Sequence, residues 1–162
     1  MEYGWGFRCP LQSHHRRFNT AVGGHALYGN ISQSANTAAG AFALAANNPG
    51  NQNVAVGQGV LRNNTGDGNA AVGYKALFAN TSGSQNVAVG QAALRSNIMD
   101  TGNTAVGFQA ATLTGGFINA TASGVTAFAY QALRNNNLDD NTAIGYPALL
   151  NNLNGIRNTA VR

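Results

Sequence analysis

The chain has 162 residues, the length of one domain or two small ones, and only 9% of them are charged. A typical soluble domain carries about 25% charged residues, whereas Asn, Gly, Ala and Thr take their place here. This composition argues against a core of large, closely fitted side chains, and it also lacks the charge and proline of a disordered chain. Small residues together with Asn favour narrow, regularly stacked backbone, so internal repeats are the first feature to look for.

The net charge of +4 is not clustered in the sequence. Three cations lie in the first 17 residues and one is the last residue, while the others are far apart: Arg62, Lys75, Arg95, Arg134 and Arg157. Nucleic-acid binding usually requires a clustered cationic surface, so we expect no nucleic-acid partner. Cys9 is the single cysteine, which excludes an internal disulfide bond and a cysteine-based zinc site.

Residues 1–17 precede the repeated part of the chain and are expected to form a non-repeat leader, for which disorder is one expectation. The first six residues do not combine a charged segment with an apolar stretch, so no signal peptide is expected. No apolar run in the chain has the length of a membrane span. His14, His15 and the two Arg residues that follow favour a flexible basic leader over a metal or phosphate site.

From residue 18 onward one phrase returns along the chain: Asn-Thr-Ala-Val-Gly-x-x-Ala-Leu-x-x-Asn, followed by a short turn rich in Gly, Asn and Asp. Successive copies begin 17, 17, 16, 17, 17, 22, 16 and 17 residues apart, and the extra residues of the long step fall between Gly115 and Gly124. This period predicts an all-β tandem-repeat solenoid, a parallel β-roll or β-helix, over residues 18–162 with coils of about 17 residues. The last copy stops at Arg162 in mid-repeat, so we expect a truncated domain or one module of a longer fibre.

Each position of the repeat predicts a structural role. Thr-Ala-Val alternates between two faces and ends at Gly, which is typical of a short β-strand that runs into a bend. The Ala-Leu pair belongs either to a second short strand or to one helical turn, and both remain open. Each unit is too small to bury its own Leu and Val, so stacking should bury them one coil away and align equivalent residues as ladders. The predicted structural ladder contains Asn19, Asn36, Asn53, Asn69, Asn86, Asn103, Asn141, Ala88, Ala105, Leu61, Leu77 and Leu94.

The third position of the repeat is Ala in every copy, as at Ala88 and Ala105. Because Thr and Val of the strand share one face, Ala points to the other. Two interpretations are open and are compatible with each other. The Ala position lines a narrow interior with room only for a methyl group, or it forms a flat face against which a neighbouring subunit packs.

The phrases at residues 19–23, 86–90 and 141–145 resemble the head repeats of trimeric autotransporter adhesins. Those heads repeat a short Asn/Ser-Val-Ala-Ile-Gly-like motif and fold as a left-handed parallel β-roll with three chains per fibre. The Gly-x-x-Ala-Leu continuation at residues 73–77 is similar to the shafts of phage tail fibres and related bacterial surface proteins. The resemblance covers about residues 19–162. It implies a homotrimer at a cell or virion surface, with a host-surface receptor or matrix ligand as partner.

No catalytic, cofactor or metal site is readable, and we expect that the chain is not an enzyme. Residues 22–27 match the hexapeptide of left-handed β-helix acyltransferases, but here the hexapeptide occurs once per coil instead of continuously. The acidic residues of the repeat lack the Gly-Gly-x-Gly-x-Asp pattern of calcium-binding solenoids, so turn formation is their favoured role. They are Asp67, Asp100, Asp139 and Asp140.

The recurrence of Thr at the second position of the repeat makes ice binding an alternative function, although a weaker one. Val54, Ala70 and Val87 interrupt this row, and the position is expected to face inward.

Two rows of side chains are candidates for ligand contact. Aromatic residues recur at the sixth position and Arg at the tenth: Tyr74, Phe108, Tyr130 and Tyr146, then Arg62, Arg95 and Arg134. Rigid scaffolds often present such side chains to partners, although the aromatic residues alternatively cover an edge of the core. The sequence therefore predicts a non-catalytic structural or adhesive module of a surface fibre. The alternative is a phage tail-fibre shaft with no binding role of its own.

Overall fold

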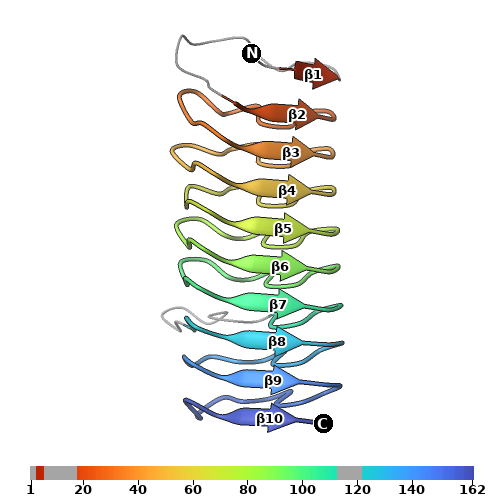
Figure 1. Cartoon of the computed structure of the whole chain (residues 1–162), viewed down its shortest axis with the longest axis vertical. Helices are drawn as coiled ribbons and strands as arrows, with labels where there is room; N and C mark the ends of the chain where they lie inside the picture. The colour runs from red at the N-terminus through yellow and green to blue at the C-terminus, as the bar shows by residue number, and fades with distance from the viewer. Residues whose placement is uncertain (1–2, 6–17, 113–121) are drawn as a thin grey trace.

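The computed structural model describes residues 3–5, 18–112 and 122–162. Ten short parallel strands stack in chain order into one sheet, with one strand per coil (Figure 1). The predicted all-β solenoid with coils of about 17 residues is therefore confirmed. The strands are β1 (Tyr3–Trp5), β2 (Thr20–Val22), β3 (Thr37–Ala39), β4 (Val54–Val56), β5 (Ala70–Val72), β6 (Val87–Val89), β7 (Thr104–Val106), β8 (Thr126–Phe128), β9 (Thr142–Ile144) and β10 (Thr159–Val161).

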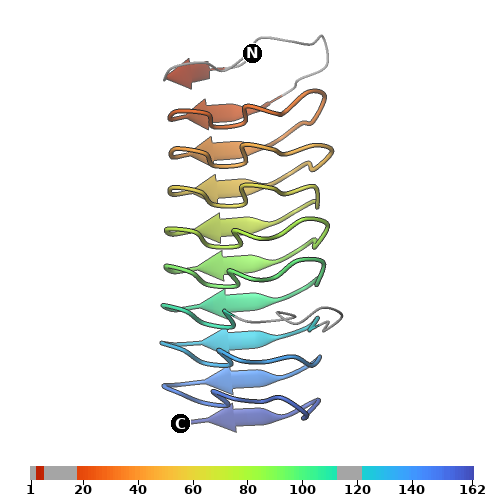
Figure 2. The same cartoon turned by 180° about the vertical axis from the view of Figure 1, so that it is seen from behind.

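The chain follows the same path in every coil. It runs along the strand at the front of Figure 1, bends at the right-hand edge, returns behind the strand and descends at the left-hand edge. This path makes the solenoid left-handed. One side of the column is a continuous parallel sheet, and the returning segments form the opposite side, which faces the viewer in Figure 2.

The strands pair in register, so each residue meets its equivalent in the next coil. Ala88 of β6 lies opposite Ala71 on one side and Ala105 on the other. In β6 the central Ala is buried while Val87 and Val89 are exposed, and the same alternation recurs along the sheet. The prediction that stacking buries the Val of the strand is wrong, as is the prediction that the Thr row faces inward, because the strand's single inward position is the Ala.

The Ala-Leu segment forms neither a second strand nor a helical turn. It is a series of overlapping turns, in which Ala26 N–H donates to the carbonyl of Gly23 at 3.3 Å. Tyr28 N–H then donates to the carbonyl of His25, also at 3.3 Å. The backbone φ is +61° at His25 and +52° at Leu27, the sign that a type II turn requires at its third residue. Sequence periodicity does not reveal such turns, because these residues are not glycine.

Burial offsets the strain of these left-handed residues. Leu44, Leu61 and Leu77 occupy the same position in successive coils, each with a φ of +49°. Left-handed backbone costs a residue other than glycine about 1–2 kcal/mol. All three side chains are fully buried, and burying a Leu side chain contributes about 1.5–3 kcal/mol. Hydrophobic burial therefore holds the turn in a conformation that the isolated peptide would avoid.

Glycine follows the strand because two coils approach closely there. Gly90 has a φ of +130°, and a Cβ atom at this residue would lie 2.5 Å from the carbonyl oxygen of Gly107 in the next coil. Both the φ and the contact exclude a side chain without local movement. Stacking therefore favours Gly at the fifth position of the repeat.

The sheet extends one strand beyond the predicted repeat domain. Tyr3–Trp5 forms β1, which pairs with β2 in register. Residues 6–17 of the predicted leader lie outside the described residues, as do residues 113–121, which hold most of the predicted insertion. On both sides of that insertion the sheet continues, since β7 pairs directly with β8.

Candidate functional site: two surfaces of the solenoid

The Asn residues that begin the coils form a buried hydrogen-bond ladder. The side-chain oxygen of each accepts a bond from the backbone N–H of its equivalent one coil later. Asn103 N–H donates to Asn86 Oδ1 at 2.9 Å, and the Asn86 side-chain amide donates to the turn carbonyl of Asp100 at 2.9 Å. The predicted ladder residues are all buried: Asn19, Asn36, Asn53, Asn69, Asn86, Asn103 and Asn141.

A second Asn ladder runs beside the first and was not included among the predicted ladder residues. Asn80 Nδ2 donates to Asn64 Oδ1 at 2.6 Å, and Asn97 Nδ2 donates to Asn80 Oδ1 at 2.8 Å. The recurrence of Asn at the twelfth position was the available signal. Because buried polar groups are stabilising only when they are hydrogen-bonded, these two ladders hold the turns in place and leave their side chains no capacity for a ligand.

The invariant Ala and the Leu residues fill the interior. Ala88 and Ala105 are 0% exposed, as are Leu61, Leu77 and Leu94. Of the two interpretations, the Ala position therefore lines the narrow interior, where a neighbouring subunit could not contact it. A substitution such as Ala88→Glu would therefore disrupt the core of the solenoid, so it cannot be used to test for a subunit interface.

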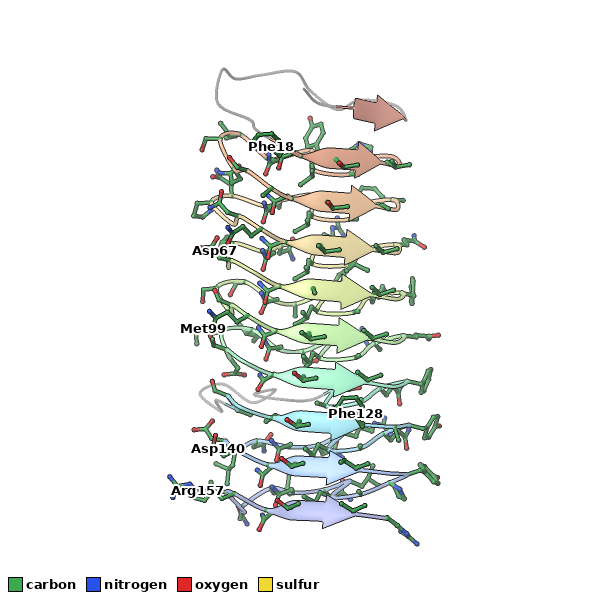
Figure 3. All side chains as sticks on the ribbon, viewed as in Figure 1. Phe18, Asp67, Met99, Phe128, Asp140 and Arg157 are labelled. Atoms are coloured by element: carbon green, nitrogen blue, oxygen red, sulfur yellow. The ribbon has the colours of Figure 1, made fainter. Side chains whose placement is uncertain are left out.

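The surface on which the strands face solvent is uncharged and consists of a mostly Thr row and an apolar row, and we call it the sheet face. It consists of the two outward residues of each strand from β2 to β10. Val54, Val56, Val72 and Val89 remain about two-fifths exposed, at 38% to 41%, and Figure 3 shows Phe128 in the same row further down the sheet. The row at the second position is Thr20, Thr37, Val54, Ala70, Val87, Thr104, Thr126, Thr142 and Thr159; the row at the fourth is Val22, Ala39, Val56, Val72, Val89, Val106, Phe128, Ile144 and Val161.

A second surface follows the bend after each strand and the start of the returning segment, and we call it the aromatic–cationic band. Aromatic rings stack from coil to coil within it: the centroids of Phe108 and Tyr130 are 5.2 Å apart with an interplanar angle of 9°. Lys75 Nζ lies 5.1 Å from the centroid of the Tyr74 ring and 5.4 Å from that of Phe78. The band contains His25, Tyr28, Phe42, Arg62, Tyr74, Lys75, Phe78, Arg95, Phe108, Tyr130, Arg134 and Tyr146.

Every residue predicted for ligand contact lies in this band. Arg62, which is exposed, lies over the ring of Phe42 at 5.2 Å. Tyr130 and Tyr146 are 46% and 60% exposed, so these rings do not act merely as a cover for the core. The cations that are widely separated in sequence are brought into line by the repeat, and the aromatic residues between them join the same surface.

The acidic residues lie at the opposite edge, in the turns that lead into the strands. Figure 3 places Asp67 and Asp140 at this edge, with Arg157 next to Asp140. Within the described parts of the chain, the one ion pair joins Arg157 Nε to Asp140 Oδ2 at 3.8 Å. Burial raises the pKa of the Asp100 carboxyl, and the charge of Asp139 raises it further, while a backbone hydrogen bond involving Ala122 opposes both effects.

The described residues were also compared with the requirements of a metal site and of a membrane span. In residues 3–5, 18–112 and 122–162, no three His, Cys, Asp or Glu side chains gather in a way that would hold a metal ion. No helix in these same ranges is long and apolar enough to cross a membrane. Comparison with family models, with curated proteins and with solved structures found no match. The resemblance to adhesin heads therefore depends on the repeated motif itself.

Proposed function

We propose that the chain is a non-catalytic structural and adhesive module of a surface fibre, in which three copies pack their sheet faces together. The sheet face is the observation that carries this proposal. It presents outward Val side chains on six of the nine strands from β2 to β10 and Phe or Ile on two more, and no residue of these strands is charged. A soluble monomer rarely leaves so continuous an apolar surface in water.

The regularity of the face suits association with identical copies. Its side chains recur at the coil spacing of about 4.8 Å, so copies aligned in parallel would bring the same rows together in every coil. A closed ring of three identical chains covers each face without leaving one free. This arrangement agrees with the trimer that the resemblance to adhesin heads implies, and it leaves the aromatic–cationic band on the outside of the fibre.

The trimer is tested by measuring molar mass in solution by light scattering after size-exclusion chromatography. The test variant is the double substitution Val56→Glu and Val89→Glu on the sheet face. The matched control is Gln58→Glu and Gln91→Glu, which adds the same charge at exposed positions of the same two coils. We expect a trimer for the unmodified chain and the control, and monomers for the test variant, because burying unpaired carboxylates is costly.

Circular dichroism separates dissociation from unfolding in this experiment. The test variant should keep the β-sheet spectrum of the unmodified chain while its molar mass falls. A folded monomer for the unmodified chain overturns the trimer. A control that dissociates as readily as the test variant would show that added charge, and not the sheet face, is responsible.

A tail-fibre shaft with no binding role shares the proposed trimer and differs only in lacking a ligand. The aromatic–cationic band favours the adhesive module, because exposed Tyr and Arg side chains on a rigid scaffold are the residues that binding surfaces most often use. In both cases the chain belongs to a fibre at the surface of a cell or a virion.

Ice binding is a second candidate, supported by the outward direction of the Thr row. Thr20 is exposed and Thr104 half-buried on a flat, uncharged sheet, with methyl and hydroxyl groups repeating about every 4.8 Å between coils and about 6.7 Å along a strand. The row is still interrupted at Val54, Ala70 and Val87. Ice binding needs the sheet face free, so thermal hysteresis from a monomeric chain would favour this candidate over the trimer.

A further inference from the structure

Three Arg residues of the aromatic–cationic band form a straight row along the fibre axis. Arg62, Arg95 and Arg134 occupy the tenth position in every second coil, which places their backbones about 9.5 Å apart. Lys75 adds a cation in the coil between the first two. The chain has no Asp or Glu at the sixth to tenth positions of any coil. The row is therefore a line of positive charge without local neutralisation.

The aromatic side chains give the same surface a second property. Phe108 and Tyr130 cover each other's faces, and Tyr146 packs edge-on against Tyr130 at 5.2 Å. The ammonium of Lys75 lies over the neighbouring rings of Tyr74 and Phe78. These contacts cover one ring face in each pair, while Tyr130 and Tyr146 remain 46% and 60% exposed and can contact a ligand. An aromatic edge carries the positive end of the ring quadrupole, so it adds to the attraction for anionic oxygens.

Amide groups complete the polar character of the band. Gln131 Nε2 donates to Gln109 Oε1 at 3.0 Å, which orders two side chains in adjacent coils. Each amide retains further donor or acceptor capacity. Hydroxyl-rich ligands are recognised by this combination of amides, Tyr hydroxyls and guanidinium groups, while carboxylates and sulfates pair with Arg through two parallel hydrogen bonds.

We propose that the aromatic–cationic band binds a linear acidic polysaccharide that lies along the fibre axis. An extended polysaccharide with an acidic group on alternate rings repeats its charge at an interval comparable to the spacing of the Arg row. A nucleic-acid duplex fits less well, because each strand carries a phosphate about every 3.4 Å and winds away from a straight line. Single-stranded nucleic acid is bound largely by stacking on open aromatic faces. Here the Phe108–Tyr130 stack and the Lys75 ammonium already cover a face of four rings, which reduces such stacking.

The inference names the ligand class of the proposed adhesive module and rests on that function. It does not require the trimer, since the band lies on the bend and the returning segments and not on the sheet face. Binding and molar mass are therefore measured on the same samples. A trimer that fails to bind the polysaccharide would overturn only the inference, whereas a monomer that binds would overturn only the trimer.

The test measures the affinity of the full chain for hyaluronan oligosaccharides, which carry a carboxylate on alternate rings. Isothermal titration calorimetry at low ionic strength is compared with the same titration at 0.5 M NaCl. Dextran is the uncharged probe, and a single-stranded DNA of similar length is the competing polyanion. We expect hyaluronan binding that weakens with salt, because salt screens exposed charges, together with no dextran binding and weaker DNA binding.

The variant that removes the row is the double substitution Arg62→Gln and Arg95→Gln, both at exposed positions. Its control is Arg157→Gln at the opposite edge, compared with Arg62→Gln alone so that each variant removes one charge. We expect about tenfold weaker hyaluronan binding for the double substitution, a smaller loss for Arg62→Gln alone and less than a twofold change for Arg157→Gln. Equal losses for Arg62→Gln and Arg157→Gln, DNA binding as tight as hyaluronan binding, or no hyaluronan binding at low salt would each overturn the proposal.

Discussion

The regular coils from Asn36 to Asn103 and the interrupted coil between Asn103 and Asn141 show what stacking demands of the sequence. In the regular coils every first position is Asn and every fifth is Gly. The interrupted coil, which contains β8, has Val125 and Ala129 at those positions and lies next to the insertion. Its strand nevertheless pairs in register on both sides. The sheet therefore tolerates a coil that lacks two of the three features shared by all its neighbours.

The third feature, the Ala of the strand, does not vary in either region. Ala105, Ala127 and Ala143 are all 0% exposed. At this position the interior has room only for a methyl group, so the residue is limited by volume and a larger side chain cannot replace it. The Asn and Gly positions are limited by hydrogen bonding and by backbone conformation, which a neighbouring coil can partly supply. Exchanging the residues at the first and fifth positions between the regular and the interrupted coils would measure the contribution of hydrogen bonding and of backbone conformation separately.

The largest expected effect comes from breaking the Asn ladder in a regular coil. Asn86→Val removes the acceptor of the Asn103 N–H and the donor to the Asp100 carbonyl. A buried donor without a partner costs about 1–3 kcal/mol, so we expect a loss of about 2–4 kcal/mol in the free energy of unfolding, measured by urea denaturation. The reverse exchange, Val125→Asn, should restore a ladder step and gain about 1 kcal/mol. Equal and small effects in both directions would show that the ladder contributes little.

The repeat fold was predictable because its signals are local and are repeated many times. A strand of three residues followed by Gly, such as Val87–Val89 before Gly90, is visible in most copies. Which face is buried was not predictable from one chain. Val and Leu have similar hydrophobicity, but only Leu94 is buried and Val89 is 39% exposed. The narrow coil has space for one of the two large side chains, and this is decided by the turns of the returning segment.

The ligand-contact residues illustrate the same limit. The shared positions of Arg62, Arg95 and Arg134 were readable from the sequence, and so was the aromatic row. Their union into one surface depends on the overlapping turns, which bring Lys75 between Tyr74 and Phe78. Those turns require positive φ at residues other than glycine, as at Lys75 with +54°, and such conformations leave no mark on composition or periodicity.

A smaller effect is expected from exchanging the residue at the fifth position. Ala129 has a φ of +114°, which is unfavourable for a residue with a Cβ atom. Ala129→Gly should raise the free energy of unfolding by about 1 kcal/mol, because relief of strain exceeds the added chain entropy. Gly90→Ala should lower it by about 2 kcal/mol, since its Cβ atom meets the Gly107 carbonyl. Urea denaturation of both variants checks the pair, and a gain for Gly90→Ala would contradict it.

The smallest effect concerns Asp100, which occupies a position held by Gly66 and Gly83 in earlier coils. Its side chain is buried beside the interrupted coil, and this burial raises the pKa of its carboxyl above the ordinary value of 3.8. A group with a raised pKa binds its proton more tightly in the folded state. Its contribution to stability is therefore present at acidic pH and is lost as the pH rises through the folded-state pKa.

Asp100→Asn should consequently stabilise the chain at pH 7 by less than about 1 kcal/mol, and the gain should shrink as the pH is lowered. Urea denaturation between pH 4 and pH 7 measures this difference. Asp67→Asn is the control, because it removes the same charge from an exposed turn in a regular coil. Since Asp100 is still present in this control, its free energy of unfolding should keep the pH dependence that Asp100→Asn removes. If Asp100→Asn and Asp67→Asn gave the same profile, burial beside the interrupted coil would not be what distinguishes the two carboxyl groups.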